Sequence, residues 1–385
     1  MTTQSDNPSV VRRALLGVLP AVASLSGCRS GAPTPPASGP RPVDGRPPGA
    51  VLASGPRQAG VDRPTQPQTH AVVSVYDFPP GADPARVAAR LGEAILELTG
   101  KPRITIGLEV GDLTVTVGMG PRLVGLAHQG VAGGLELPAF AGEERTADAW
   151  GGDLLVQTCA GDPVAAVLSD THLSAQLTSD GASRRWSQTG FRPPGGGAVR
   201  NLLGFPDGIE NPHTRSDLER EVWLPEPAAL ADATIAVVRR LRIDVPAFLA
   251  QPPARQEEVI GRRKADGAPL SGGDPADRLD LAAKSARGRY LVPAMAHARR
   301  ANPNATGSGR MLRRGYSYHN DPTDQGLLFI SFQRQLRTFT ATQRRLDDGD
   351  DLMRFVTATA SGAFLILPGF SPEKPLGSGV FAGRR

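Results

Sequence analysis

Strand-like and helix-like segments follow one another in a set order along the chain, and this order restricts the fold more than any other feature. Residues 70–78, 113–117 and 153–159 have the β-branched or apolar character of strands. Apolar residues at helical spacing predict helices over 84–98 and 162–173. The resulting order of strand, helix, strand, strand, helix is typical of a ferredoxin-like unit.

A second run of the same kind follows an irregular middle. Residues 189–215 are rich in Gly, Pro and Asn and are predicted to form loops. Beyond them, the patterns predict strands over 233–244, 327–333 and 362–367, a short helix over 256–262 and a polar helix over 346–357. The prediction is therefore an α+β protein with two ferredoxin-like halves, residues 54–218 and 219–385. A body of about 330 residues is too large for one ordinary core, which favours two subdomains.

The first 28 residues resemble an export signal. Arg12 and Arg13 form a twin-arginine pair, and the thirteen residues 14–26 carry no charge, which suits a secretory signal and is too short to span a bilayer. The segment ends in Leu-Ser-Gly-Cys28, which resembles a bacterial lipobox. We therefore expect export by the twin-arginine route and a lipid anchor on Cys28 that holds the protein to the cell membrane on its outer side. The alternative is an ordinary cleavage site that matches the lipobox by accident.

The segment after this signal is predicted to be a tether. Residues 29–53 contain seven Pro and four Gly in 25 positions and almost no bulky side chain, so they cannot bury a core. The chain has only two cysteines. With Cys28 lipidated, Cys159 stands alone in an apolar strand, where we expect a buried residue rather than a reactive thiol.

The positive charge of the chain does not indicate a nucleic-acid partner. Five Arg and two Asp before residue 54 contribute +3 of the formal +5, which leaves 38 basic and 36 acidic residues in the body. No basic block lies beside an aromatic cluster. The charges are those of a solvated surface, and we expect no nucleic acid among the partners.

Two motifs contain residues suited to peroxide chemistry. In Gly204-Phe205-Pro206-Asp207-Gly208, glycines flank one Asp and let a flat ligand approach, although the motif alone fits a tight turn better. His297 could ligate haem iron and leave the opposite face open, or could be an ordinary core or surface histidine. Arg313, sixteen residues later, offers a positive charge for a departing anion, while Asp207 offers a proton acceptor. The alternative for the arginines around Arg313 is a solvated basic face.

Several longer blocks, taken in their order, resemble the dye-decolorizing peroxidase family, in its exported bacterial subgroup associated with iron uptake. The resemblance spans nearly the whole body and is far more specific than any single motif. Its blocks are 58–61 (QAGV), 112–118 (DLTVTVG), 200–212 (RNLLGFPDGIENP), 260–264 (IGRRK), 267–272 (GAPLSG), His297 with 301–303 (ANP), 312–316 (LRRGY) and 326–333 (GLLFISFQ).

This resemblance implies a fold, a cofactor and a site. The fold is two ferredoxin-like halves with haem b, one per chain, bound between them. His297 would be the iron ligand, with Asp207 and Arg313 as the pair that activates hydrogen peroxide while a dye-like or phenolic one-electron donor is oxidised. The residues that would line the haem are Gly208, Ile209, Glu210, Asn302, Pro303, Asn304 and Arg313. A homodimer and proteins of an iron-uptake system are further partners that the resemblance suggests. The alternative function is a deferrochelatase-like one, in which the protein handles haem or releases its iron.

The chain departs from the family pattern at four positions. Met295 and Ala296 stand where an Asp is usual before the histidine, and Asn304 stands where an Arg often follows Asn-Pro. Arg57 replaces a common His, and Gln335 replaces an acidic residue. The pattern does not reveal the acidic partner of the His297 imidazole, for which Asp351 is a weak candidate.

The export prediction can be tested with two variants. Replacing Arg12 and Arg13 together by Lys should leave the precursor in the cytoplasm, because the twin-arginine route requires the pair. Cys28→Ser should allow export but release the protein from the membrane fraction, because no acyl chain can be attached. Cell fractionation and the N-terminus of the mature protein would measure both effects. Wild-type protein found entirely in the soluble exported fraction, with an N-terminus other than Cys28, would contradict the lipid anchor.

Overall fold

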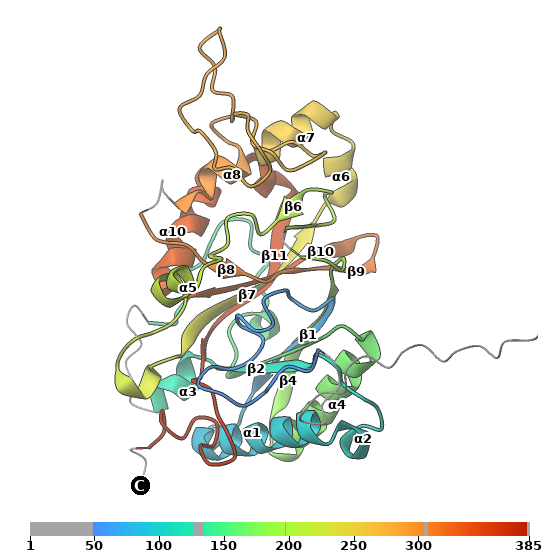
Figure 1. The fold of residues 1–385 in the computed structure, drawn as a ribbon, viewed down its shortest axis with the longest axis vertical. Coiled ribbons are helices and arrows are strands. Elements are labelled where there is room, and N and C mark those ends of the chain that lie inside the picture. The colour runs from blue at the N-terminus through green and yellow to red at the C-terminus, as the bar shows by residue number, and fades with distance from the viewer. Residues whose placement is uncertain (1–48, 127–133, 197, 304–306, 383–385) are drawn as a thin grey trace, which may run out of the picture. The chain divides into compact units, whose positions relative to one another are not determined.

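A computed structural model describes residues 49–126, 134–196, 198–303 and 307–382 (Figure 1). These residues belong to one compact unit, Arg46–Arg385. The export signal, with Arg12, Arg13 and Cys28, and most of the tether lie outside the described residues, as does Asn304. The residue boundaries predicted for the export signal, the tether and the two halves stay predictions. No helix in the described ranges is long and apolar enough to cross a membrane.

The first half is a ferredoxin-like unit. Its strands pair antiparallel in the order β2-β3-β1-β4. Each of its two long helices begins at an Asp-Pro pair: Asp83 and Asp162 cap the helices with their carboxylates, and proline occupies the first helical position. The elements are β1 (His70–Asp77), α1 (Pro84–Gly100), β2 (Thr114–Met119), β3 (Leu154–Ala160), α4 (Pro163–Ser179) and β4 (Ser183–Phe191).

The second half repeats this topology. Its strands pair in the order β11-β7-β10-β9. When the strands of each half are numbered along the chain, leaving out the short β8, both halves have the same order: fourth, first, third, second. Its first crossover is expanded into a long insertion that carries short helices and His297. The elements are β7 (Thr234–Ile243), α6 (Val245–Leu249), α7 (Pro253–Ile260), α8 (His297–Arg300), β8 (Leu312–Arg313), β9 (Tyr316–Asp321), β10 (Asp324–Gln333), α10 (Leu336–Asp347), η3 (Asp351–Phe355) and β11 (Val356–Ile366).

Two narrow seams join the half-sheets into a closed barrel. β11 pairs with β2 at Leu365–Met119 and Ile366–Gly118, and β4 pairs with β9 at Phe191–Ser317. Within the second half, β7 pairs with both β10 and β11. Three short elements lie within the first half: α2 (Pro102–Thr105), α3 (Pro121–Leu126) and η1 (Ala147–Ala149). Four more lie between β4 and β7 and connect the halves: β5 (Val199–Arg200), β6 (Pro206–Asp207), α5 (Arg215–Glu221) and η2 (Ala228–Leu230).

Alternating strand residues divide the apolar side chains between the inside and the outside of the barrel. Val73, Leu155, Val238, Ile330 and Phe364 belong to one fully buried cluster that draws on both half-sheets. The free thiol of Cys159 is buried in this cluster, as predicted. Helices α1 and α4 cover the outer face of the first half-sheet and form a second cluster with it. The outer face of the second half-sheet is covered differently, by α8, α10 and the segment that contains β6.

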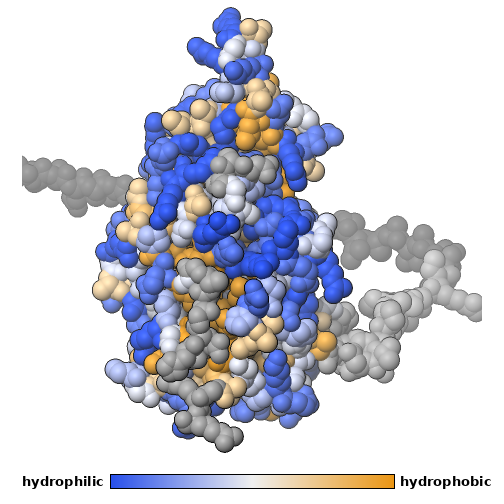
Figure 2. Space-filling model, turned by 90° about the vertical axis from the view of Figure 1, so that its left-hand side faces the viewer, coloured by the Kyte–Doolittle hydropathy of each residue, from blue (hydrophilic) through white to orange (hydrophobic). Residues whose placement is uncertain are grey.

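The predicted elements are largely correct in type, and one is wrong. The helix expected over 346–357 is instead α10, ten residues earlier, followed by η3 and β11. Leu336 and Phe339 supply the buried face of α10, but threonine and arginine between them weaken its pattern. The strands β4 and β9 were also missed, because their exposed positions carry Arg, Ser, His and Asn. The face in Figure 2 is covered mainly by hydrophilic side chains, with smaller hydrophobic areas between them.

The close pairing of β10 with β7 makes a prediction at Gly326. A Cβ at this position would stand 2.0 Å from the Leu241 carbonyl oxygen on the neighbouring strand, so the strands must move apart. We expect Gly326→Ala to lower the free energy of unfolding by ~1–3 kcal/mol. The control is Gly100→Ala at the end of α1, where a Cβ meets no atom within 4 Å. It should be neutral or slightly stabilising, and equal effects of the two variants in denaturant titrations would contradict the argument.

Candidate active site

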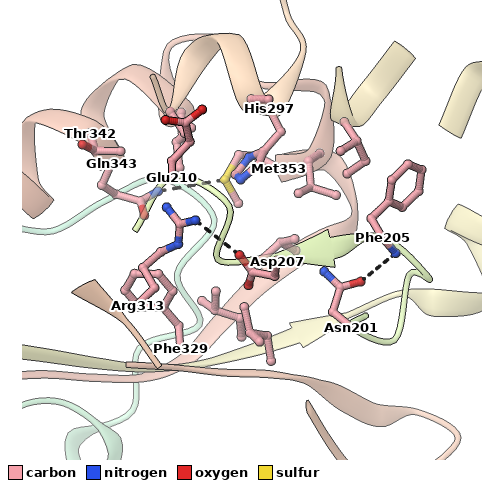
Figure 3. Close-up of a pocket in the computed structure, with 18 of the residues that line it drawn as sticks. Asn201, Phe205, Asp207, Glu210, His297, Arg313, Phe329, Thr342, Gln343 and Met353 are labelled. Atoms are coloured by element: carbon pink, nitrogen blue, oxygen red, sulfur yellow. Dashed lines mark hydrogen bonds and ion pairs between the residues drawn. The ribbon is translucent and has the colours of Figure 1, made fainter. Parts of the chain in front are cut away.

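A deep pocket lies against the outer face of the second half-sheet (Figure 3). Its cavity has a volume of about 230 Å³. Its floor is formed by outward-facing strand residues such as Leu241, Leu327 and Phe329. Ala141 and Gly142, which precede β3, also line it. Residues from both predicted halves therefore contribute to one cavity.

His297 enters the pocket from the start of α8 and is held there by Asp350. The Nδ1 atom of His297 lies 2.5 Å from Oδ2 of Asp350, whose side chain is completely buried. Oδ1 of the same carboxylate accepts the backbone N–H of Leu352 and caps η3. About a third of the His297 side chain (35%) is exposed, and it lines the cavity. With Nδ1 engaged, Nε2 is the ring nitrogen left to meet a ligand in the pocket.

Asp350 also determines the protonation of the imidazole. Burial of the ring by itself lowers the pKa of His297, but the charge of Asp350 and its hydrogen bond outweigh burial and raise that pKa above its ordinary value. A carboxylate on one ring nitrogen increases the basicity of the other, which strengthens it as a metal ligand.

The acidic partner suggested by sequence was wrong by one residue. Asp351 does not contact His297; it accepts Arg255 at 2.7 Å and Arg354 at 3.3 Å on the outside of η3. The two adjacent carboxylates point to opposite sides because Asp350 is the N-cap of η3 and Asp351 its first residue. The sequence Gly-Asp-Asp alone contains no signal that separates them.

Asp207 lies at the end of β6 on the other side of the cavity from His297 (Figure 3). Its Oδ1 accepts the backbone N–H of Gly208 at 2.6 Å and Nη2 of Arg313 at 3.4 Å. Gly208 and Gly204 have φ angles of +93° and +84°, which L side chains rarely adopt. The glycines of this motif are therefore required by the turn that presents Asp207 to the pocket.

Arg313 reaches the same space from β8. Its backbone N–H donates to Oδ1 of Asn211 at 3.0 Å, and Nδ2 of Asn211 donates to its carbonyl oxygen at 2.8 Å. One amide side chain therefore fixes the backbone of Arg313 to the segment that carries Asp207. Arg313 is partly buried, with 26% of its side chain exposed, and its guanidinium faces Asp207.

The structure brings together the predicted site residues that it describes. Besides Asp207, His297 and Arg313, the pocket is lined by Gly208, Ile209, Glu210, Asn302 and Pro303. Asn304 lies outside the described residues.

Sequence reasoning missed the wall formed by α10 and η3. Phe339, Thr342, Gln343 and Leu346 follow one face of α10 into the pocket, and Leu352 and Met353 continue this wall. The spacing of residues 339, 342, 343 and 346 is typical of one face of a helix and could have revealed α10. The predicted helix instead began at residue 346, near the end of α10.

The lining suits a flat, largely apolar group with acidic substituents. Aliphatic and aromatic side chains dominate the floor and the α10 wall, and arginines lie among them. Arg262 is nearly buried and pairs with Glu210 at 3.2 Å, and Arg239 is 2% exposed with its Nε unpartnered among the described residues. Such a donor set would suit a porphyrin with two carboxylates, and His297 is the residue that would hold its iron.

Comparison with known proteins agrees with this chemistry. A sequence model described as Dyp-type peroxidase, C-terminal, matches residues 198–371. A dye-decolorizing peroxidase of Thermobifida fusca is 33% identical over 319 residues, which are 77% of this chain and 74% of that protein. The deferrochelatase of Escherichia coli is 33% identical over 284 residues, 67% of this chain and 66% of the relative. The solved oxyferrous complex of DtpA from Streptomyces lividans has a TM-score of 0.80 and 32% identity, covering 86% of this chain and 98% of that one.

These matches identify the class of protein as a peroxidase, and the family as one that uses haem. The chain belongs to the dye-decolorizing, or DyP-type, peroxidase family. The fold prediction of two ferredoxin-like halves is confirmed by the same structural match.

The His297–Asp350 pair makes a prediction for the haem-free protein. Asp350→Asn should lower the pKa of His297, because burial of the ring then acts without the charge and the hydrogen bond of Asp350. In the wild type the raised pKa stabilises the fold below the unfolded value of about 6.5, and this contribution is lost as the pH rises through the folded value. NMR titration of the six histidines would measure the pKa. Asp351→Asn is the matched control, and an equal change in both variants would contradict the assignment.

Proposed function

We propose that the chain is a haem b-dependent peroxidase that reduces hydrogen peroxide and oxidises dye-like or phenolic one-electron donors. One observation carries the proposal: His297, backed by the buried Asp350, faces a cavity whose other side presents Asp207 and Arg313. Haem bound there would supply the iron that binds peroxide and passes oxidising equivalents to the donor. His297 would hold that iron through Nε2.

Asp207 is proposed to move the peroxide proton. Its described hydrogen bonds go to Oδ1, from Gly208 and Arg313, which leaves Oδ2 as the oxygen that can exchange a proton in the pocket. A carboxylate takes the proton from one peroxide oxygen and returns it to the leaving oxygen. The fixed backbone of Gly208 keeps Oδ1 in place, so that the proton acceptor does not rotate away.

Arg313 is proposed to stabilise the negative charge that develops on the leaving oxygen. A preorganised cation in a cavity closed to bulk water acts more strongly than one in solution, since it need not reorient during the reaction. The two hydrogen bonds from the Asn211 side chain support this role, because they fix the backbone of Arg313 before peroxide arrives. Glu210 and Ile209, with Asn302 and Pro303, would contact the haem edge and faces.

A second candidate function is the release of iron from haem. It is favoured by the similarity to several deferrochelatases at 33–34% identity. The two functions differ in what the protein does without peroxide. Metal-free porphyrin recovered after incubation with haem alone would favour iron release, whereas peroxide-dependent donor oxidation well above that of free haem would favour the peroxidase.

The iron ligand can be tested by removing it. His297→Ala should lose most bound haem, because no other described histidine lines the pocket. The control is His319→Ala on β9, an exposed residue outside the pocket, which should keep wild-type haem content and spectrum. Pyridine haemochrome assays and visible spectra of the purified proteins would measure this. Full haem occupancy with an unchanged spectrum in His297→Ala would exclude it as the ligand.

The peroxide-activating pair can be tested separately from haem binding. Asp207→Asn and Arg313→Leu should keep haem but slow the first peroxide-dependent spectral change by ~10²–10⁴-fold, the usual value of acid–base help. Arg263→Leu and Asp266→Asn alter an exposed ion pair of 2.8 Å outside the pocket and serve as matched controls. Stopped-flow absorption with excess peroxide gives the rates. Wild-type rates in both Asp207→Asn and Arg313→Leu would show that the activating groups lie elsewhere.

A further inference from the structure

A hairpin between α7 and α8 projects from the body and carries exposed positive charge. It is the uppermost loop in Figure 1, at the end of the body opposite α1 and α2, and Figure 2 shows mainly hydrophilic side chains at its tip. Its outer part, residues 284–289, has the sequence KSARGR, with three basic residues and no acidic one. Lys284, Arg287 and Arg289 are exposed, and none of them forms an ion pair with another described residue.

Other basic runs of the body differ, because acidic partners neutralise them. In the run 239–242, Arg239 and Arg242 each pair with a glutamate at 2.7 Å. In the runs 262–264 and 310–314, arginines likewise pair with nearby carboxylates. The body from residue 54 onward has a formal charge of only +2, so without the hairpin tip it would carry −1. The tip therefore holds positive charge that stays available to a partner outside the body.

The hairpin holds these charges in fixed positions. The backbone N–H of Ser285 donates to the carbonyl oxygen of Arg289 at 2.8 Å, and Gly288 supplies the turn with a φ of +73°. At the base, the Arg299 guanidinium of α8 donates to two carbonyl oxygens of the hairpin, each at 2.8 Å. Binding through an ordered hairpin costs less conformational entropy than binding through a loose loop.

We propose that this hairpin binds the surface of a bilayer that contains anionic phospholipids, and that it thereby orients the body on the membrane. Each Lys or Arg near such a surface is attracted by its negative potential. A narrow projecting tip can meet a layer of mobile headgroups, whereas a stable protein partner requires a matching surface of about 800 Å² on each side. The shape and charge of the tip therefore favour a membrane over an acidic protein.

The predicted lipid anchor makes even a weak contact of this kind effective. The sequence predicts a lipid on Cys28, followed by a tether over residues 29–53. An extended tether of this length would reach up to ~75 Å, so by itself it would let any face of the body approach the membrane. A second contact then selects one orientation, since the tether keeps the hairpin at a high local concentration near the bilayer.

The proposal is separate from the proposed peroxidase function. Lys284, Arg287 and Arg289 do not line the pocket. Their variants are therefore expected to keep the haem content and the peroxidase rate per haem, so that failure of this proposal is distinguishable from failure of the proposed function. Contact through the hairpin would turn the second half, whose outer face bears the pocket, towards the bilayer (Figure 1).

Site-specific fluorescence tests the contact in the haem-loaded full chain. In a Cys28→Ser background, the remaining Cys159 is buried and is not labelled. Ala286→Cys at the exposed tip, labelled with the environment-sensitive fluorophore NBD, should shift its emission to shorter wavelength with vesicles of mixed phosphatidylcholine and phosphatidylglycerol. Vesicles of phosphatidylcholine alone should cause no shift. Ile104→Cys on α2, where the isoleucine is 82% exposed, is the matched control and should respond to neither.

Charge reversal tests whether the basic residues carry the contact. Arg287→Glu with Arg289→Glu should lower the equilibrium constant of the tip contact, measured by the spectral shift during lipid titration, at least ~30-fold. This estimate takes about a fivefold loss for each positive charge removed. Arg86→Glu with Lys101→Glu is the matched control, since it makes the same change of net charge at exposed positions on α1 and just after it. It should leave the shift unchanged, and added salt should weaken the contact in the unreversed chain.

Three outcomes would overturn the proposal. The first is an emission spectrum at Ala286→Cys that phosphatidylglycerol vesicles leave unchanged. The second is an equal loss in the two charge-reversal variants, which would indicate attraction by net charge rather than by the hairpin. The third is a shift with poly-glutamate in the absence of any shift with vesicles, which would assign the tip to an acidic protein.

Discussion

The pairing of β7 along both of its edges is the interaction on which the rest of the structure depends. β10 and β11 pair with β7 over most of its length. This pairing fixes the register of β7, and the register decides which of its side chains point into the barrel and which point outward. Ala236 and Val238 fill the barrel, while Arg239, Leu241 and Ile243 form the pocket floor. A slip of one residue would exchange these sets, burying a guanidinium in the apolar interior and removing the floor of the site.

Above this rigid floor, one buried and one half-buried polar side chain fix pocket residues that come from irregular segments. Asp350 uses one carboxylate oxygen to begin η3 and the other to orient His297, so a local helix cap and the orientation of the pocket histidine depend on one residue. Asn211 does the same for Arg313 with its amide. Each of these two side chains makes two hydrogen bonds, and for the fully buried Asp350 the loss of either bond would leave a buried polar atom unpaired. Loops of this length would otherwise place the reacting groups loosely.

The sequence predicted the repeating architecture and several residues that line one pocket, but not the contacts that position them. The strands β1, β2 and β3 are apolar over most of their length because both of their faces are buried, and α1 has a clear helical period because one of its faces is buried. Helix α10 was displaced by ten residues because its buried face is short and interrupted by threonine and arginine. Asp207, His297 and Arg313 were found through their motif blocks, whereas Asp350 and Asn211 act through contacts 53 and 102 residues away along the chain. Which of two adjacent carboxylates faces inward is decided by three-dimensional packing, and a linear pattern does not contain it.

The strand β11 has a consequence for the order in which the protein can be completed during synthesis. It is the last strand of the barrel in the chain, yet it lies between β7 and β2 and so joins the two halves. Its Ala358 exchanges backbone hydrogen bonds with Gly142 and Glu144, and Val356 and Ala358 line the pocket. A nascent chain that still lacks these residues can form the first half, but it has neither a closed barrel nor a finished cavity. The cavity can therefore take up a ligand only after β11 has been synthesised and has paired with both halves.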